Sequence, residues 1–333
     1  MLNNQTILIT GGTGSFGKAF TNYLLHKYKK IKKIIIFSRD ELKQYEMKKS
    51  FSKIHSEKLR FFLGDIRDKS RLEMAFEDVD YIVHAAALKQ VDTAEYNPLE
   101  FVKTNILGSQ NIVDACLKSK IKKVVALSTD KAAAPVNLYG ATKLCSDKLF
   151  AAANNVKGKR KISFSLVRYG NVLGSRGSIL SSFMSQSKKG FINITDEKMT
   201  RFNISMNEAV EMVDWTLNKS IGGEIFVPKL SSFRVIDFAK ILCPKCKIKK
   251  IGIRPGEKIH EEMITTSDSL NTFDLGKYYA IVGNYNEKTF NFYKKNKRLK
   301  LGFSLNSGQN KFLTKDQLKK IISENLYLVK EHN

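Results

Sequence analysis

The chain has 333 residues, of which 42% are hydrophobic, so it can bury one large core or two smaller ones and is not a disordered tail. Its formal net charge is +25, yet only 11 of its 57 basic residues are arginines, the side chain that nucleic-acid readers usually favour. We therefore expect a solvated, lysine-rich surface, no nucleic-acid partner and, since no apolar run approaches ~18 residues, no insertion into a membrane.

Short, nearly continuous apolar runs alternate with helical patterns from residue 6 to about 170. The runs are TILIT (6–10), KIIIFS (33–38), LRFFLG (59–64), YIVHAA (81–86), KVVALS (123–128) and ISFSLVRYG (162–170). Such runs are typical of strands that helices cover on both faces, so we predict an α/β fold with a Rossmann-like, doubly wound parallel sheet. Between them, Asn97 and Pro98 predict a helix that continues to about Ser119, and Asn137 predicts the cap of another.

Past residue 175 the pattern changes to helical stretches around 178–190, 205–219 and 234–243, with brief strands at GEIFVP (223–228) and KKIGI (249–253). We predict a Rossmann domain over residues 1–175, where the strands and helices alternate. Residues 176–333 are expected to form a smaller, mainly substrate-binding lobe, with some chain that crosses back to the sheet. After about Ser269 the pattern weakens.

Four cysteines are too few and too scattered for a disulfide framework: Cys116, Cys145, Cys243 and Cys246. Cys243 and Cys246 have the spacing of a redox or zinc half-site, but they have no second pair and no nearby histidine. We expect free thiols and no metal site. Because the first residues enter an apolar strand without a basic leader, we expect a soluble, cytoplasmic protein.

Glycines follow the first strand in TILITGGTGSFGKAF, where Gly11, Gly14 and Gly17 stand between a strand and a helix. This context predicts a dinucleotide site, since glycines allow a sharp turn, a close approach to a pyrophosphate and tight packing of helix on strand. The second strand ends in a hydroxyl and two cations that suit a 2′-phosphate, so NADP is favoured, although Asp40 keeps NAD open. The expected cofactor contacts are Gly11, Thr13, Gly14, Ser15, Phe16, Gly17, Ser38, Arg39, Asp40, Glu41, Leu42, Lys43, Asp65, Ile66, Ala85, Lys89, Tyr139 and Lys143.

An acid stands beside a base in STDKAAAPVNLYGATK (128–143), directly after the fifth strand. Tyr139 and Lys143 share one face of the following helix, and we expect the ammonium and the positive helix end to favour the phenolate of Tyr139. That phenolate could take a proton from a sugar hydroxyl while hydride leaves the same carbon. Asp130 and Lys131 lie immediately before this helix, which favours a catalytic role over a surface ion pair.

The strings TGGTGSFG and YGATK resemble the extended short-chain dehydrogenase/reductase superfamily. The strings FSRDELKQYEM, HAAALKQV, LSTDKAAAPVNLYGATKL, RYGNVLGSRGS, ITDEKMTRF and IRPGEKIHEEM closely resemble the C5-inverting UDP-N-acetylglucosamine 4,6-dehydratases, and the likeness runs from about residue 5 to 265. This family supplies the first intermediate of pseudaminic acid synthesis. The resemblance also implies a homo-oligomer, for which a hexamer is one option.

The resemblance implies a lyase in which oxidation at carbon 4 acidifies the proton on carbon 5. Retaining relatives carry Asp-Glu where this chain has Asp130-Lys131, so Lys131 is expected to be the base at carbon 5 and Asp130 the acid at the 6-hydroxyl. Lys131 must then be neutral, and burial is expected to lower its pKa. The expected substrate contacts are Lys89, Thr129, Lys131, Asn171, Arg176, Thr195, Arg201, Arg254 and Glu257. The chain departs from these relatives at Asp92, where a proline is expected, and at Asn203, where an aromatic is.

Three other functions remain open on the sequence. A nucleotide-sugar 4-epimerase would share the fold and Tyr139 with Lys143 but would not need Asp130 and Lys131, and its product would not be lighter by one water. A retaining dehydratase would give the other configuration at carbon 5, which NMR distinguishes. An NADP-sensing binding module without turnover would need neither pair.

Overall fold

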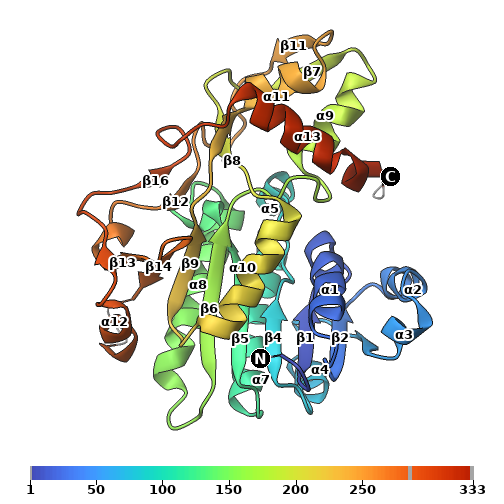
Figure 1. The fold of residues 1–333 in the computed structure, drawn as a ribbon, viewed down its shortest axis with the longest axis vertical. Helices are drawn as coiled ribbons and strands as arrows, with labels where there is room; N and C mark the ends of the chain where they lie inside the picture. The colour runs from blue at the N-terminus through green and yellow to red at the C-terminus, as the bar shows by residue number, and fades with distance from the viewer. Residues whose placement is uncertain (1, 284–286, 331–333) are drawn as a thin grey trace.

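The computed structural model describes residues 2–283 and 287–330, and within them its centre is a ten-stranded sheet (Figure 1). In spatial order the strands are β15 (Lys297–Arg298), β13 (Thr272–Asp274), β14 (Tyr278–Val282), β9 (Glu224–Pro228), β6 (Ser163–Tyr169), β5 (Lys123–Thr129), β4 (Tyr81–His84), β1 (Thr6–Thr10), β2 (Lys33–Ser38) and β3 (Leu59–Leu63). The strands from β9 to β3 pair in parallel, and β14, β13 and β15 add an antiparallel edge. The predicted doubly wound sheet is confirmed, and its antiparallel extension was not predicted.

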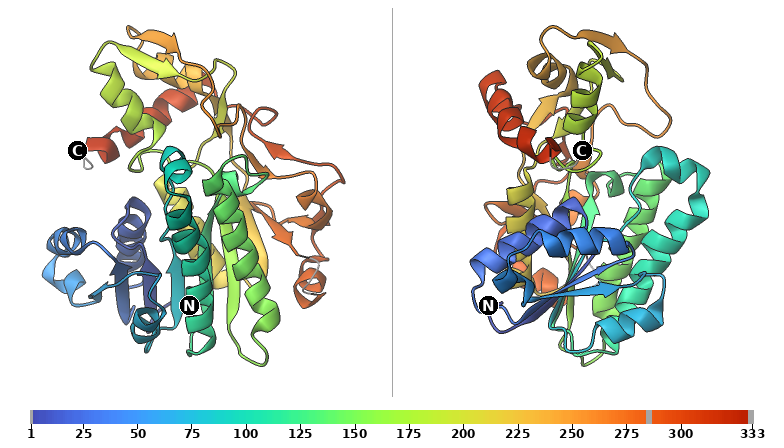
Figure 2. Two further views of the ribbon diagram at one scale, coloured as in Figure 1. Left: turned by 180° about the vertical axis from the view of Figure 1, so that it is seen from behind. Right: turned by 90° about the vertical axis from the view of Figure 1, so that its right-hand side faces the viewer.

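Helices cover both faces of this sheet (Figure 2). One face carries α1 (Ser15–Lys27) and α10 (Met206–Lys219), and the other carries α4 (Lys69–Ala75), α7 (Gly108–Leu117) and α8 (Leu138–Val156). Successive residues of β1 enter different cores, since Ile7 and Ile9 pack on the α1 side and Leu8 packs on the α7 side. This alternation explains why the strands read as continuous apolar runs. Two short helices, α2 (Glu41–Lys49) and α3 (Lys53–Ser56), connect β2 to β3.

The segment between β4 and β5 contains α5 (Val91–Tyr96), α6 (Pro98–Phe101), a π-helical stretch (Val102–Leu107) and α7. The predicted helix from Pro98 is therefore present, but it changes hydrogen-bond pattern in the middle and ends at Leu117, before Ser119. The predicted cap of α8 is confirmed, because the Asn137 side chain accepts a hydrogen bond of 2.8 Å from the Gly140 amide.

A smaller group of elements lies above the carboxyl ends of the parallel strands in Figure 1. It contains α9 (Ile179–Ser187), β7 (Phe191–Ile194), α11 (Val235–Leu242), β11 (Lys247–Lys250) and α13 (Lys315–Lys330), and it has its own core, which includes Leu180, Phe183, Phe238 and Leu318. The predicted strand 249–253 is misplaced by two to three residues, because β11 pairs with β7 only through Lys250. Beyond it, Ile251 and Ile253 are each 55% exposed.

Two small pairs of strands connect this group to the main sheet. They are β8 (Thr200–Phe202) with β10 (Ser232–Arg234) and β12 (Glu262–Ile264) with β16 (Leu305–Asn306). The remaining elements are α12 (Glu287–Tyr293) and two 3-10 turns, Asp130–Ala132 and Asp268–Asn271. Through the residues described, no helix is both long and apolar enough to span a bilayer.

We expected all four cysteines to be free thiols, and this is wrong for Cys243 and Cys246. Cys243 and Cys246 form a disulfide at the end of α11, where a tight turn brings their Cα atoms to 5.3 Å. This separation lies within the usual range for a disulfide, so the spacing that suggested a redox half-site does produce a bond. Cys116 and Cys145 are free thiols.

Candidate active site

The predicted residues gather where the parallel strands end and helices begin, the usual ligand-binding edge of such a sheet. At the end of β1, Gly11 has φ of +66°, and a Cβ there would lie 2.9 Å from the Ala86 backbone. A Cβ on Gly17 would lie 2.3 Å from the Gly12 carbonyl oxygen, so α1 can approach β1 only without a side chain. Gly14 begins α1 without a side-chain cap. These features fit the cradle of a dinucleotide pyrophosphate at a helix N-terminus.

At the end of β2 the cations expected near a ribose phosphate have carboxylate partners. Lys43 pairs with Asp40, which also caps α2 by accepting a hydrogen bond of 3.0 Å from the Lys43 amide. Arg39 lies 3.6 Å from Asp65. The Arg39 and Lys43 side chains are 51% and 41% exposed, so both can reorient toward a bound anion. Ser38 is buried, and its hydroxyl accepts a hydrogen bond of 3.0 Å from Gln44.

Tyr139 and Lys143 come from the first two turns of α8, and both are buried. The Lys143 ammonium donates a hydrogen bond of 2.8 Å to the Leu127 carbonyl at the end of β5, and burial lowers the pKa of Lys143. Burial also raises the pKa of Tyr139 to about 12, although the charge of Lys131 acts in the opposite direction. Burial therefore opposes the phenolate that Lys143 and the helix end were expected to favour.

Lys131 lies between two buried carboxylates. Its ammonium is 3.1 Å from Asp130 Oδ1 and 3.1 Å from Glu261 Oε1, and it donates a longer hydrogen bond of 3.4 Å to Asn171 Oδ1. Burial acts to lower the pKa of Lys131, but Asp130 and Glu261 outweigh it and raise the pKa. The expectation that burial lowers the pKa of Lys131 is therefore wrong, because two carboxylates lie beside the buried amine.

Asp130 is completely buried at the start of the 3-10 turn. Its Oδ1 accepts a hydrogen bond of 3.0 Å from the Thr129 hydroxyl, while its Oδ2 has no hydrogen-bond partner among the residues that the structure describes. Burial raises the pKa of Asp130, and the charge of Lys131 only partly offsets this. A carboxyl group with a raised pKa can serve as a general acid.

The loop after β6 meets the glycine turn. The Arg176 amide donates a hydrogen bond of 3.2 Å to the Ser15 hydroxyl, and the Arg176 carbonyl accepts one of 3.1 Å from Lys89. Burial lowers the pKa of Lys89. Two residues expected to contact the substrate, Lys89 and Arg176, therefore lie beside a residue expected to contact the cofactor.

Three other expected substrate contacts, Thr195, Arg254 and Glu257, lie in the chain that follows β7 and β11 of the smaller group of elements. Arg254 pairs with Glu257 and lies 3.5 Å from Asp92, one of the two positions at which the chain departs from its relatives. The Arg254 side chain is 54% exposed. Thr195 is buried. Burial acts to raise the pKa of Glu257, but the neighbouring Arg254 outweighs it and lowers this pKa, and a hydrogen bond with the Thr195 side chain acts in the same direction.

Sequence reasoning missed Glu261, which belongs to the quoted string IRPGEKIHEEM. Its side chain is 3% exposed and contacts both Lys131 and Arg201, whose Nε lies 3.7 Å from Glu261 Oε1. Two consecutive glutamates before a short apolar strand were the available signal, because side chains on a strand alternate between faces and one of the two had to point inward.

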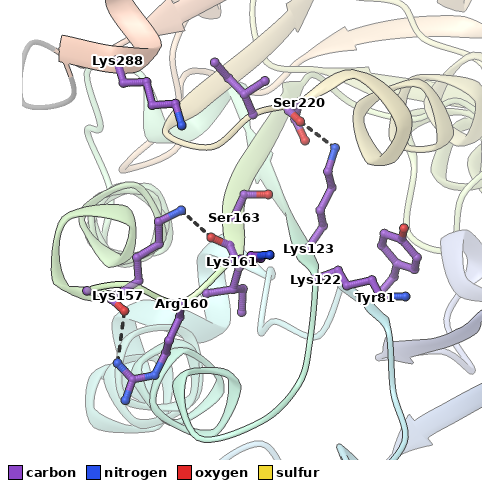
Figure 3. Close-up of a pocket in the computed structure, with 12 residues that line it drawn as sticks. Tyr81, Lys122, Lys123, Lys157, Arg160, Lys161, Ser163, Ser220 and Lys288 are labelled. Atoms are coloured by element: carbon purple, nitrogen blue, oxygen red, sulfur yellow. Dashed lines mark hydrogen bonds between the residues drawn. The ribbon is translucent and has the colours of Figure 1, made fainter.

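A basic hollow of about 570 Å³ lies at the opposite, amino-terminal edge of β4, β5 and β6 and contains none of the predicted site residues (Figure 3). Its cations have structural partners, since Lys123, Lys157 and Arg160 donate to the carbonyl oxygens of Ser220, Ile162 and Lys157, respectively. These bonds satisfy carbonyl groups at the ends of strands and helices.

The chain is similar to known proteins over most of its length. A family model described as polysaccharide biosynthesis protein matches residues 7–283. The chain is 51% identical to UDP-N-acetylglucosamine 4,6-dehydratase (inverting) from Campylobacter jejuni, over 93% of this chain and 94% of that relative. It is 41% identical to UDP-glucose 4-epimerase from Rickettsia canadensis, over 84% of each. The X-ray structure of Pen from Bacillus thuringiensis is similar with a TM-score of 0.90 at 36% identity, covering 98% of this chain and 99% of that one.

Proposed function

We propose that this chain, which belongs to the polysaccharide biosynthesis protein family, removes water from UDP-N-acetylglucosamine and inverts carbon 5. The proposal follows its similarity to an inverting UDP-N-acetylglucosamine 4,6-dehydratase. The observation that carries the proposal is the grouping of Asp130, Lys131 and Tyr139 at the end of β5, where an acid, an amine and a phenol lie together. A 4-keto dehydration with inversion needs four proton transfers: from the 4-hydroxyl, from carbon 5, to the departing 6-hydroxyl and back to carbon 5.

The residues of the glycine turn fit a nicotinamide dinucleotide, and NADP is our choice because Arg39 and Lys43 can turn toward a 2′-phosphate. When bound, the nicotinamide supplies reversible acceptance of hydride. Gly11, Gly14 and Gly17 would admit the pyrophosphate, and Lys143 and Tyr139 would lie along the nicotinamide ribose.

Tyr139, Lys131 and Asp130 would divide these proton transfers among them. Tyr139 takes the proton of the 4-hydroxyl. Because its pKa is raised, the phenol must first lose its own proton, either because substrate binding lowers this pKa or because a neighbouring group accepts the proton. Lys131, once deprotonated, takes the proton of carbon 5, which the neighbouring ketone has acidified. Asp130 gives its proton to the departing 6-hydroxyl, a role that suits its raised pKa. Reprotonation of carbon 5 from the opposite face, through Tyr139, gives the inverted centre.

The nucleotide part of the substrate would be held by cations and donors around the same edge. Arg254 would bind a phosphate and Glu257 would accept from the ribose diol, once the present pair between them opens. Lys89, Thr129, Asn171, Arg176, Thr195 and Arg201 would complete the contacts. The product would be UDP-2-acetamido-2,6-dideoxy-β-L-arabino-hex-4-ulose, which we place at the first step of pseudaminic acid synthesis for surface glycosylation, in the cytoplasm and in a homo-oligomer.

A 4-epimerase is the second candidate, since one relative with 41% identity bears that name. Incubation with UDP-N-acetylglucosamine and NADP, followed by mass spectrometry, separates the two functions. A dehydratase gives a product lighter by one water, and an epimerase gives a product of unchanged mass. NMR of the product then tests whether carbon 5 is inverted.

The Lys131→Ala variant tests the residue assignment in the same assay. We expect it to lose dehydration while it still binds NADP, because the side chain acts on the sugar and not on the dinucleotide. Lys148→Ala is a control, since Lys148 is an exposed lysine of α8, the helix that carries Tyr139. Normal water loss by Lys131→Ala would refute the assignment.

A further inference from the structure

Glu261 has the shortest contacts to Lys131 of any residue far from it in the chain. Its Oε1 lies 3.1 Å from the Lys131 ammonium, the same distance as Asp130 Oδ1. The Glu261 side chain is 3% exposed and that of Lys131 is 20% exposed, so little water screens the pair. The ammonium is therefore held between one carboxylate that directly follows β5 and one that directly precedes β12.

The backbone of Glu261 is fixed by a residue near the end of the chain. The Glu261 amide donates a hydrogen bond of 2.9 Å to the Ser307 hydroxyl, and the Ser307 amide donates one of 2.8 Å to the Glu261 carbonyl. Ser307 is fully buried, and its hydroxyl also lies 2.7 Å from that of Thr200. Because the main chain is pinned on both sides, the carboxylate has a defined position relative to Lys131.

Charged groups of both signs surround Lys131 and Glu261. Asp130, Glu261, Arg201 and Tyr139 face Lys131, and Lys131, Arg201 and Lys258 face Glu261. The Arg201 Nε lies 3.7 Å from Glu261 Oε1, and its Nη1 donates to the Thr200 carbonyl at 2.7 Å. In their ionised forms Asp130 and Glu261 balance Lys131 and Arg201, and Lys258 adds a third positive charge on the side of Glu261. Removal of the Glu261 charge alone would leave an excess of positive charge beside Lys131.

We propose that Glu261 is a positioning residue that aims the Lys131 amine and sets the pH at which this amine loses its proton. The inference rests on the proposed function in one respect, since it assumes that the neutral amine is the reactive form. It assigns to Glu261 two separable effects: the hydrogen bond places the nitrogen, and the negative charge retains the proton. The two effects can be divided by substitution.

Three variants separate position from charge. Glu261→Gln keeps an oxygen that can accept from Lys131 but removes the charge, so the acidic limb of the pH profile of kcat should move to lower pH by about 1 to 3 units. Glu261→Asp keeps the charge but withdraws it by one methylene, so kcat should fall with a smaller change in the profile. Glu261→Ala loses both, and kcat should fall across the pH range. Glu262→Gln is the matched control, since Glu262 is charged, adjacent and without a contact to Lys131 among those described.

The proton on Lys131 can be followed without turnover. Competitive labelling with acetic anhydride at pH 9, with the Lys131 peptide quantified by mass spectrometry against surface lysines, reports the neutral fraction of the amine. We expect about 10-fold to 1000-fold faster labelling of Lys131 in Glu261→Gln than in the wild type or Glu262→Gln. Thermal melting and dinucleotide binding, measured on each variant, establish that the variants are folded.

The outcomes are distinct. Unchanged labelling of Lys131 in folded Glu261→Gln overturns the inference. Faster labelling with an unchanged pH profile of dehydration supports the role of Glu261 and refutes Lys131 as the base, which is a failure of the proposed function alone. If Glu261→Gln does not fold, Glu261→Asp must still label faster than the wild type, and the inference is wrong if it does not.

Discussion

The Lys131→Met substitution tests the electrostatics of the site through protein stability, without any ligand. Methionine has nearly the length of the lysine stem but no charge, so the variant keeps the packing and removes the ammonium. Asp130 and Glu261 then remain as two buried carboxylates that lack their shared cation. We expect the variant to be less stable than the wild type because an unpaired charge inside a protein is poorly solvated.

The size of the expected loss of stability follows from the burial of this ion pair. Loss of one partner from a buried ion pair costs about 3–5 kcal/mol. Arg201, whose Nε is 3.7 Å from Glu261, stays in place and compensates in part. We therefore expect a loss of about 3 kcal/mol in the free energy of unfolding at pH 7.5, at the lower end of that range.

The loss should depend on pH with a defined sign. Without Lys131 the two carboxylates repel each other, so their folded pKa values rise above the unfolded values of ~3.9 for Asp and ~4.3 for Glu. The folded variant then binds more protons than the unfolded chain, and its stability falls as pH rises through this interval. In the wild type, Lys131 and Arg201 lower the pKa of Glu261 against the effect of burial, so the Glu261 contribution has the opposite sign and is lost as pH falls. The deficit of the variant should be smallest near pH 5 and largest at neutral pH.

Urea unfolding at pH 5 and pH 7.5 measures both quantities. The single tryptophan, Trp215, lies in α10 against Phe226 and Tyr278 and reports on the main sheet by fluorescence. Lys118→Met is the control, since it removes an exposed ion pair to Glu73 and should change stability little at either pH. A Lys131→Met variant as stable as the wild type at pH 7.5, or with the same deficit at both pH values, would refute the reasoning.

Three further predictions concern other parts of the chain. Arg39→Glu should weaken NADP binding more than NAD binding, because the cation is expected to contact the 2′-phosphate; titration calorimetry with both dinucleotides measures this, and equal effects would count against it. Gly17→Ala should lower the free energy of unfolding by about 1–3 kcal/mol and weaken dinucleotide binding, because its Cβ would lie 2.3 Å from the Gly12 oxygen. Gly14→Ala should destabilise the fold less, because its Cβ would lie 3.2 Å from the Gly11 oxygen. Iodoacetamide should modify two cysteines of the denatured, unreduced protein and four after reduction, as mass spectrometry would show; four in both cases would contradict the Cys243–Cys246 bond.

The parts of the fold that the sequence predicted are those specified locally. Each parallel strand is a continuous apolar run because both of its faces are buried, and Asn137 caps α8 through a bond only three residues long. The antiparallel edge was missed because β13, β14 and β15 are short and are defined by pairing with one another and, through β14, with β9, which is far away in the sequence. Such strands carry little signal in their own residues.

For the candidate site, the sequence indicated which residues lie close together more fully than it indicated their protonation. Tyr139, Lys143, Asp130 and Lys131 stand within fourteen residues of one another, and a helix fixes their relation. The proton on Lys131, however, depends on Glu261, which only the tertiary fold brings within 3.1 Å. Burial alone suggested a neutral amine, and the unforeseen carboxylate reverses that conclusion.

The bonds between Glu261 and Ser307 have a consequence for synthesis on the ribosome. Domains fold as units, beginning with the segments that emerge first. The glycine turn and the first six parallel strands are complete by residue 169, so a nascent chain can build its nucleotide cradle early. The pinned carboxylate beside Lys131 has to wait until residue 307 has emerged, so unfinished molecules would have the cradle before they have the charge balance of a working enzyme.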